Sequence, residues 1–573
     1  MTEIVATNII SPLGRTTEQN FRAVACGRTA LSHYGCRGSF PGPFTAAAFG
    51  PESIAELAVE GFTRFESLVI CSVEEALSRT DVDTSSDRCL FILSTTKADV
   101  EQLGCDSSED GAYLAPGAAA RKIARHLGFV NDPLVVCNAC ISGVTAQVLA
   151  HRLLSAGYYD TAVVCGADCL SDFALAGFSS FKSLSEGECR PFDIERNGLN
   201  LGEAAATVVL RRCGDAAQGC RAPEKSWKIS SCSLNNDAYH VSAPSPDGDG
   251  AFRAINETMT GRDCSALSLL NVHGTATMFN DQMESRAVER AGLSDVPATA
   301  LKGYFGHTLG ASGLLESIIS MAAADAGTVP ATRGFSQGGV SGRINVSAES
   351  RECCTAGVLK ISSGFGGCNG AILYSKDGRG CGPAKAGASE AKTLHTVRIT
   401  PQRVELDGKI SETDSTCGRV TLDGLYRNHG WDYPRFHKMD SMGKLLFAAT
   451  ELLVSACPFS AEEPGRAVLL FNASSSVLSD RRHIASYSGE AGFFPSPSVF
   501  LYTLPNVAVG EIAIRYGIKG ETSLMILDGR NDTLMDAVVD ATLKLSDAEN
   551  MITGWLDCPS EDEFIADLKF LSR

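Results

Sequence analysis

The sequence has fewer basic than acidic residues and contains no long apolar run. Its 573 residues include 50 Lys and Arg against 67 Asp and Glu, which gives a formal net charge of −17. This charge argues against a general nucleic-acid-binding protein, because phosphate contacts need a basic surface. No apolar run approaches the roughly 20 residues of a membrane-spanning helix, and the N-terminus lacks a basic segment followed by an apolar one. We therefore expect a cytoplasmic protein without a membrane span.

A complete metal-binding set is also missing from the sequence. The 21 cysteines are scattered, and a chain of this length does not need disulfides to stabilise its core. Cys137 and Cys140 have the Cys-x-x-Cys spacing of redox and zinc sites, but no second such pair and no His-x-x-x-His motif accompanies them. We therefore expect no metal site.

The order of the predicted elements favours an α/β protein with more than one domain. Short apolar segments such as 89–93 and 161–165 alternate with helical stretches such as 66–77. Strands that alternate with helices are typical of a layered α/β fold. Residues 377–392 are rich in Gly, Ala and Lys, which predicts a flexible linker. This linker separates a first unit, residues 1–376, from a second unit, residues 393–573.

The second unit repeats part of the first at a constant offset of 389 residues. The matched pairs are Pro116 with Pro505, Ala119 with Ala508, Ile123 with Ile512, Ala124 with Ala513, Gly128 with Gly517, Leu154 with Leu543, and Asp168 with Asp557. An ungapped match that includes a helix-ending glycine favours common ancestry over chance. In this register Cys140 corresponds to Gly529. The second unit is therefore predicted to be a degenerate half-copy without a nucleophile.

Cys140 stands at a position that suits a nucleophile. An apolar run at 133–137 predicts a buried strand, a sharp turn holds Cys140, and a helix is predicted from Ser142 to its end at Gly157. A nucleophile elbow has this strand, turn and helix arrangement. The N-terminus of a helix favours a thiolate over a thiol. The alternative is an inert buried cysteine, which is the commoner case.

Five motifs, taken together and in this order, resemble the β-ketoacyl-acyl-carrier-protein synthases, which are condensing enzymes of the thiolase fold. The motifs are Ala139–Gly143 (ACISG), Arg190–Asp193 (RPFD), His273–Thr277 (HGTAT), Lys302 with Gly306–Gly313 (GHTLGASG), and Gly364–Gly367 (GFGG). The resemblance covers about residues 1–376. It implies a thiolase-like αβαβα layered fold, followed by a second, partial thiolase-like domain.

The resemblance also implies roles for the central residues. Cys140 matches the nucleophile that accepts an acyl group from a phosphopantetheine thioester. Cys137 is expected to pack on its strand, out of reach of the substrate. His273 and His307 match the paired histidines whose N–H groups stabilise the oxyanion of the malonyl thioester. Lys302 matches a buried lysine that is paired with a glutamate, here Glu316.

Four further residues match family positions nearer the edge of the site. Phe365 matches a gating phenylalanine between the acyl and malonyl sites, and its backbone N–H and that of Cys140 match the donors to the acyl carbonyl. Thr275 and Thr277 match hydroxyls that contact pantetheine. Arg196 matches a basic position where carrier proteins dock. The alternative is a core aromatic for Phe365, a loop hydrogen bond for each threonine, and a solvated surface arginine for Arg196.

The family implies acyl-chain elongation by decarboxylative Claisen condensation with malonyl-acyl carrier protein. No cofactor is expected, since phosphopantetheine arrives on the carrier protein, which is the expected partner. Family members form two-fold dimers through the sheet edge beside the nucleophile strand, so we expect a homodimer or a heterodimer with a related subunit. The second unit is expected to pack against the first or to mimic a non-catalytic subunit.

Three alternatives stay open at this point. A thiolase-fold acyltransferase without decarboxylation is disfavoured, because thiolases replace one of the two histidines with a second cysteine. A non-catalytic partner such as a chain-length factor fits the second unit better than the first. A scaffold that binds carrier proteins without turnover is the third. The sequence departs from the family pattern at 95–99, 202–204 and 361–363, which leaves the acyl chain and the partner geometry open.

Overall fold

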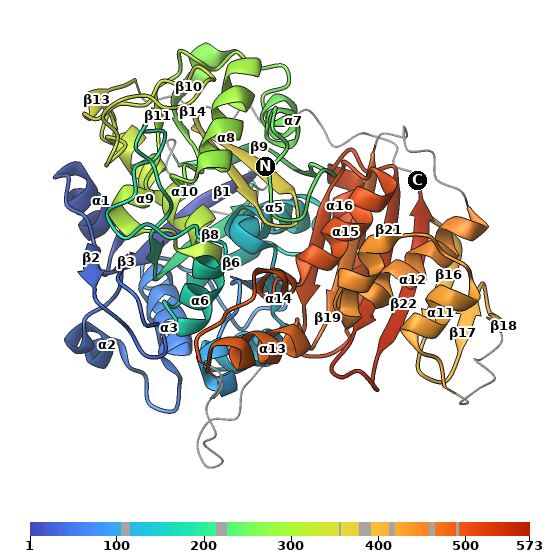
Figure 1. The fold of residues 1–573 in the computed structure, drawn as a ribbon. Helices are drawn as coiled ribbons and strands as arrows, with labels where there is room; N and C mark the ends of the chain where they lie inside the picture. The colour runs from blue at the N-terminus through green and yellow to red at the C-terminus, as the bar shows by residue number, and fades with distance from the viewer. Residues whose placement is uncertain are drawn as a thin grey trace.

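The computed structural model describes residues 1–104, 115–213, 226–354, 357–376, 391–411, 419–457, 465–488 and 492–573. The predicted linker at 377–392 lies outside the described residues, apart from its last two positions. Figure 1 shows the first unit in blue to yellow and the second unit beside it in orange and red. Among the described helices, none has both the length and the apolar composition needed to cross a lipid bilayer.

The first sheet contains the strand that precedes Cys140. Its order is β5 (Leu134–Val136), β4 (Cys89–Ser94), β6 (Thr161–Asp168), β8 (Ala204–Arg212) and β1 (Thr2–Ile10). β5, β4 and β6 run parallel, which places their carboxyl ends at one edge of the sheet. The side chains of β4 and β5 are buried throughout, as expected for strands that are covered on both faces.

A second sheet in the first unit carries the histidine segments. Its order is β9 (Lys228–Asn236), β15 (Cys368–Ser375), β14 (Gly357–Gly364), β10 (Leu267–Asn271) and β11 (Ala298–Thr299). Helices α5 (Ser142–Ser155) and α10 (Ser312–Asp325) pack between the two sheets. Helix α3 (Arg64–Leu77) covers the outer face of the first sheet, and α7 (Asp249–Thr258) that of the second. These five layers confirm the predicted αβαβα fold.

The second unit repeats the strand order of the first sheet. Its sheet runs β20 (Thr522–Ile526), β19 (Arg466–Asn472), β21 (Asn550–Asp557), β22 (Ile565–Ser572) and β16 (Lys392–Ile399). β21 begins and ends 389 residues after β6, which is the offset found in the sequence. Helices α15 (Asn506–Tyr516) and α16 (Asp532–Leu545) begin and end within one residue of that offset from α4 (Pro116–His126) and α5.

The two units join as the halves of a two-fold dimer would. β20 pairs antiparallel with β5, so that Met525 lies opposite Val136 and Ile526 lies opposite Val135. Met525 stands 389 residues after Val136, so Val136 pairs with its own counterpart, as it would on a two-fold axis. Helices α13 (Val477–Ser488) and α14 (Pro497–Tyr502) also reach α6 (Asp172–Ser180) of the first unit (Figure 1). The second unit therefore occupies the sheet edge beside the nucleophile strand.

Candidate active site

Cys140 lies in a short turn between β5 and α5. The residue before it, Ala139, has a φ of 48°, a left-handed conformation that is strained for a side chain other than glycine. Close packing maintains this turn: a Cβ added at Gly143 would lie 2.9 Å from the carbonyl oxygen of Gly310. The strand, turn and helix predicted around Cys140 are therefore present, and the side chain is 8% exposed.

His273 and His307 lie beside Cys140. His273 follows β10, and His307 follows α9 (Lys302–Phe305) through Gly306, whose φ is 67°. The Cys140 sulfur and a ring nitrogen of each histidine lie within 4.8 Å of one another. The two rings are nearly perpendicular, at 85°, with their centres 5.2 Å apart. One sulfur and two imidazoles from distant parts of the chain thus share one small space.

Both imidazoles are neutral in this environment. Burial, followed by the positive charge of Lys302, lowers the pKa of His273 and of His307 well below the usual value. Lys302 Nζ lies 3.3 Å from His273 Nδ1, so Nδ1 accepts and the proton of His273 is on Nε2. His307 is 1% exposed, and neither of its ring nitrogens has a hydrogen-bond partner among the described residues. Each ring can therefore present an N–H group to a substrate oxygen.

Lys302 and Glu316 form the buried ion pair that the resemblance implies. Lys302 Nζ donates to Glu316 Oε1 at 2.7 Å and to the backbone oxygen of His273 at 2.6 Å. Burial opposes ionisation of Glu316, but the ammonium groups of Lys302 and Lys360 outweigh it and hold the pKa of Glu316 at about 2. The pair thereby fixes the backbone of His273 as well as its ring.

Lys360, on β14, belongs to the same network, and the sequence analysis missed it. Its side chain is fully buried, and Nζ donates to Asn271 Oδ1 at 2.7 Å and to Glu316 Oε2. One carboxylate therefore holds two ammonium groups. A lysine inside the apolar run of a buried strand was the signal that could have identified it, because a buried lysine requires a partner.

We expect Lys360→Met to destabilise the protein by about 1–3 kcal/mol, because it removes the partner of two buried oxygens while Lys302 still neutralises Glu316. The midpoint of denaturant unfolding measures this loss. Lys376→Met is the matched control, since it breaks the partly exposed pair with Asp325 and should cost less than about 1 kcal/mol. Equal losses in the two variants would contradict the described network.

Burial reverses the ionisation that was predicted for Cys140. It raises the pKa of the thiol to about 12, against the attraction of Lys302, so the free protein holds a thiol and not a thiolate. The start of a helix was expected to favour the thiolate, whereas burial acts in the opposite direction and exceeds the attraction of Lys302. The nucleophile therefore needs a group that accepts its proton.

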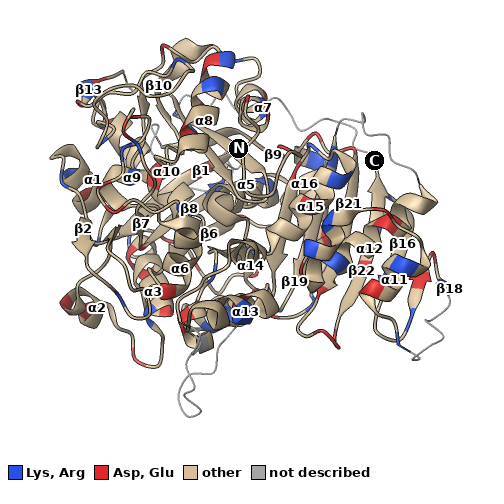
Figure 2. Cartoon of the chain, in the orientation of Figure 1, with Lys and Arg blue, Asp and Glu red and all other residues tan. Residues whose placement is uncertain are grey.

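Arg196 does not lie where a docking role would place it. It is 5% exposed, and its guanidinium donates to the backbone oxygens of Asp193, Gly339 and Met278. Arg196 stands at the position that the family motif predicts, but its side chain is buried, because it donates to these carbonyl oxygens. In the cartoon of Figure 2, Lys and Arg positions are interspersed with Asp and Glu positions along the chain.

The two threonines and Phe365 lie around the site. The hydroxyls of Thr275 and Thr277 hydrogen-bond each other at 2.8 Å, and Thr277 precedes α8 (Met278–Arg290). The ring of Phe365 packs against Phe181 and Phe178, at 5.5 and 6.2 Å between centres. The position of the two threonines is compatible with contacts to pantetheine, and that of Phe365 with a gate. These roles stay predictions.

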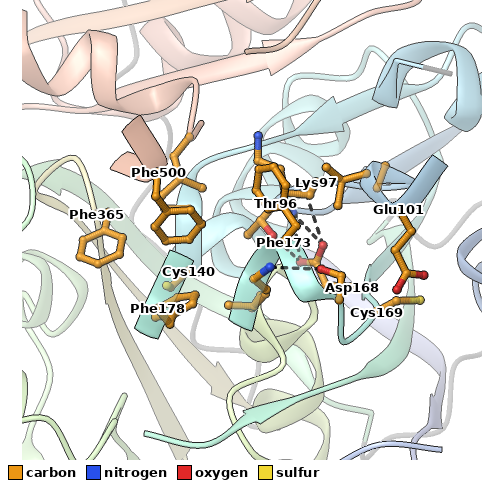
Figure 3. Close-up of a pocket in the computed structure, with 17 residues that line it drawn as sticks. Thr96, Lys97, Glu101, Cys140, Asp168, Cys169, Phe173, Phe178, Phe365 and Phe500 are labelled. Carbon is orange, nitrogen blue, oxygen red and sulfur yellow. Dashed lines mark hydrogen bonds between the residues drawn. The ribbon is translucent and has the colours of Figure 1, made fainter. Parts of the chain in front are cut away.

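Cys140 opens into a small cavity of about 30 Å³ that both units line. Figure 3 shows Phe178, Phe365 and Phe500 close to Cys140, and Lys97 and Asp168 farther along. Phe500 belongs to the second unit. Lys97 Nζ, which also lines the cavity, donates to Asp480 Oδ1 of the second unit at 2.5 Å. Sequence alone did not identify Phe500 or Asp480, because their place depends on how the two units dock.

Comparison with known proteins shows that the first unit is similar to β-ketoacyl synthases. Residues 52–216 match the N-terminal domain of β-ketoacyl synthase, and residues 227–336 match its C-terminal domain. A putative mitochondrial 3-oxoacyl-[acyl-carrier-protein] synthase of Schizosaccharomyces pombe is 31% identical over 277 residues, which are 44% of this chain and 64% of that protein. The 3-oxoacyl-[acyl-carrier-protein] synthase 2 of Rhizobium meliloti is 34% identical over 257 residues, 42% of this chain and 60% of that protein. The chain thus spans less than two thirds of either relative.

Solved structures extend the similarity to the second unit. A ketosynthase of Xenorhabdus doucetiae, solved in complex with its chain length factor, has a TM-score of 0.53 and 25% identity, and the match covers 65% of this chain and 97% of that one. A structure described as "PfaC Keto synthase-Chain length factor" has a TM-score of 0.78 and covers 100% of this chain and 78% of its own. At 14% identity, the second match shows the fold alone. Residues 52–216 and 227–336, which lie within the first unit, belong to the β-ketoacyl synthase family.

Proposed function

We propose that the protein extends an acyl chain by decarboxylative condensation with a malonyl group carried on an acyl carrier protein. The observation that carries this proposal is the approach of the Cys140 sulfur and the two imidazoles to within 4.8 Å. The names of the relatives, 3-oxoacyl-[acyl-carrier-protein] synthases, support the reaction class.

In the first step, the Cys140 sulfur attacks the carbonyl carbon of an acyl thioester. A new carbon–sulfur bond forms, the bond to the carrier sulfur breaks, and the carrier thiol leaves with the proton that Cys140 gives up. Because Cys140 is a thiol, a neutral imidazole must relay this proton, and His307 has two unbonded ring nitrogens for the task. The backbone N–H groups of Cys140 and Phe365 are the expected donors to the carbonyl oxygen.

In the second step, the malonyl thioester loses CO2, and the electron pair of the broken carbon–carbon bond forms an enolate. The N–H groups of His273 and His307 stabilise the enolate oxygen, and neutral imidazoles do so without adding a charge to the ground state. The enolate carbon attacks the acyl carbonyl, and Cys140 leaves as a thiolate that takes up one proton. The products are a 3-oxoacyl carrier and CO2.

The proposal needs no metal and no nucleotide, since phosphopantetheine arrives on the carrier. Cys140, His273 and His307 have the residue types of a zinc site. The ammonium of Lys302, 3.3 Å from His273 Nδ1, opposes a divalent cation at that place. We therefore assign these three residues to acyl transfer.

We also propose that the second unit takes the place of a partner subunit. β20 occupies the edge of β5 through which family members are expected to dimerise, so a homodimer of this chain would have to use another surface. The contribution of Phe500 to the cavity beside Cys140 supports a role of the second unit in selecting the acyl chain.

We expect Phe500→Ala to lengthen the acyl chains that Cys140 accepts by about two to four carbons, because the removed ring volume of roughly four methylenes lies in the cavity. The measurement is the mass of the adduct after incubation with a panel of acyl thioesters. Phe494→Ala is the matched control, because Phe494 is a phenylalanine of the same unit that is 74% exposed. The same chain-length profile in both variants would contradict this role of Phe500.

The reaction itself is tested with the full chain, an acyl carrier thioester and a malonyl carrier thioester. The expected result is a covalent acyl adduct and the release of CO2 that depends on the malonyl substrate. Absence of an adduct would leave a carrier-binding scaffold, and condensation without malonyl-dependent CO2 release would indicate a thiolase-type reaction. Either result would overturn the proposal.

A further inference from the structure

The second unit contacts the glycine turn of the first unit, Gly364–Gly367, which includes Phe365. Asn506 Nδ2 donates to the backbone oxygen of Phe365 at 2.8 Å, and the same nitrogen lies 3.7 Å from the sulfur of Cys368. Asn506 is the first residue of α15 and is 3% exposed. The turn is close to the nucleophile, since a Cβ added at Gly364 would lie 3.2 Å from the backbone nitrogen of Cys140.

The side chain of Asn506 is oriented by its donor group. The carbonyl oxygen of Phe365 can only accept a hydrogen bond, which fixes the amide nitrogen on that side. Asn506 Oδ1 is buried and has no hydrogen-bond partner among the described residues. An unpaired buried oxygen is unfavourable, and an apolar side chain of the same size would avoid it. The favourable contribution of this side chain is therefore the bond to Phe365.

The internal repeat shows that this contact exists only on the side that has a nucleophile. At an offset of 389, Asn506 corresponds to Gly117. Gly117 lies against the second unit's elbow region, where a Cβ would come within 2.3 Å of the carbonyl carbon of Leu527. That region has Gly529 in place of Cys140. The two related positions thus differ. Asn506 places a donor side chain beside the elbow that has Cys140, whereas Gly117 has no side chain to place beside the elbow that has Gly529.

A second pair of repeat positions differs in the opposite sense, with glycine in the second unit. Gly510, one turn along α15, corresponds to Arg121 of the first unit. A Cβ at Gly510 would lie 2.6 Å from the backbone oxygen of Gly366, so only glycine lets α15 approach the turn this closely. Asn236 Nδ2 of the first unit donates to the same oxygen at 2.7 Å. The glycine turn is therefore held by Asn506 of the second unit and by Asn236, Asp237 and Val241 of the first.

We propose that Asn506 is a positioning residue for the condensation: through the backbone of Phe365, it fixes the gate over Cys140 and the N–H group that faces the acyl carbonyl. This inference rests on the proposed function for its catalytic meaning. The second unit then contributes to turnover at Cys140 and not only to the wall of the cavity. Without the hydrogen bond, the turn can move and Phe365 no longer covers the thiol.

The first test is the rate at which iodoacetamide alkylates Cys140, followed by peptide mass analysis of the full chain. Asn506→Ala should raise this rate about 5-fold, which is the scale of one lost hydrogen bond. Asn506→Asp has the same shape but no amide donor, so it should show the same increase. A rate in Asn506→Asp equal to that of the wild type would show that side-chain volume and not the hydrogen bond matters, and would overturn the proposal.

The matched control is Asn531→Ala. Asn531 is also in the second unit and donates to Asp132 of the first unit at 2.9 Å, away from the glycine turn. It also caps α16, so its removal destabilises the protein without touching the gate. Alkylation of Cys140 in this variant should stay within 2-fold of the wild type. An equal increase in Asn531→Ala and Asn506→Ala would mean that general loosening is responsible.

The second readout is the ratio of CO2 released to condensed product. With the gate fixed, decarboxylation is coupled to an acylated Cys140 and the ratio should be near one; Asn506→Ala should raise it about 5-fold. A proportional loss of both products, with an unchanged ratio, would overturn the positioning role. If the wild type releases no CO2 from malonyl carrier, the proposed function fails, whereas the alkylation comparison still tests the link between Asn506 and the turn.

Discussion

Cys140→Ala is expected to abolish the acyl adduct and to lower condensation by about 10⁴-fold or more, the scale seen when a covalent nucleophile is removed. In the proposed reaction, the sulfur carries the acyl group between the two half-reactions, and no other nucleophile replaces it in the geometry described here. Intact mass after incubation with an acyl thioester measures the first effect, and product formation measures the second.

Cys137→Ala is the control for this variant. Cys137 lies three residues before Cys140 and is fully buried, with its sulfur donating to the backbone oxygen of Thr96 at 3.3 Å. Its loss should reduce stability by about 1–2 kcal/mol and leave condensation within a few-fold of the wild type. A Cys140→Ala protein that still forms an acyl adduct, or a Cys137→Ala protein that does not, would refute the assignment of the nucleophile.

The second large effect is expected at the histidines. His273→Ala should lower decarboxylation of malonyl carrier by about 10²–10³-fold, because it removes a hydrogen-bond donor aimed at the developing oxyanion. Acylation of Cys140 should fall by less than about 10-fold, since His273 Nδ1 is occupied by Lys302 and His307 is the assigned proton relay. His307→Ala should impair both steps. Single-turnover mass shifts and CO2 release, measured separately, distinguish the two variants.

His126→Ala serves as the control for both histidine variants. His126 is an exposed residue at the end of α4 and lies 3.9 Å from Glu74. We expect both half-reactions to be unchanged in this variant. The roles given to the histidines would be contradicted if His273→Ala slowed acylation as much as decarboxylation, since it would then act on the site as a whole.

The local motifs allowed much of the site to be predicted from the sequence. The strand, turn and helix around Cys140 depend on a short segment whose conformation is determined locally, whereas the approach of His273 and His307 was implied by the resemblance. The pairing of Lys302 with Glu316 was implied by the resemblance, and it meets the need of a buried lysine for a partner. The layered fold followed from the alternation of strands and helices.

The errors have physical reasons. The expected thiolate at Cys140 was wrong because burial raises the thiol pKa more than the nearby positive charge lowers it. The docking role of Arg196 was wrong because a position in a motif carries no information on exposure. Lys360 was missed because its partners, Asn271 and Glu316, come from two other elements. A sequence pattern does not show which groups a folded chain brings together.

The second unit shows a further limit of sequence reasoning. The offset of 389 residues predicted a half-copy, and the register of Val136 with Met525 follows the same offset. The offset did not show that Phe500 and Asn506 reach the site of the first unit. Those contacts depend on the antiparallel pairing of β5 with β20, which joins two edges that are far apart in the chain.

Peptide mass mapping of the full chain after brief incubation with an acyl carrier thioester tests the central claim most directly, because it identifies the residue that holds the acyl group. The claim that Cys140 works with two converging histidines predicts one acyl adduct on the peptide with Cys140, at that residue, and its disappearance when malonyl carrier is added. An adduct on Cys137 or on another side chain would contradict it, as would condensation that proceeds with no adduct on Cys140.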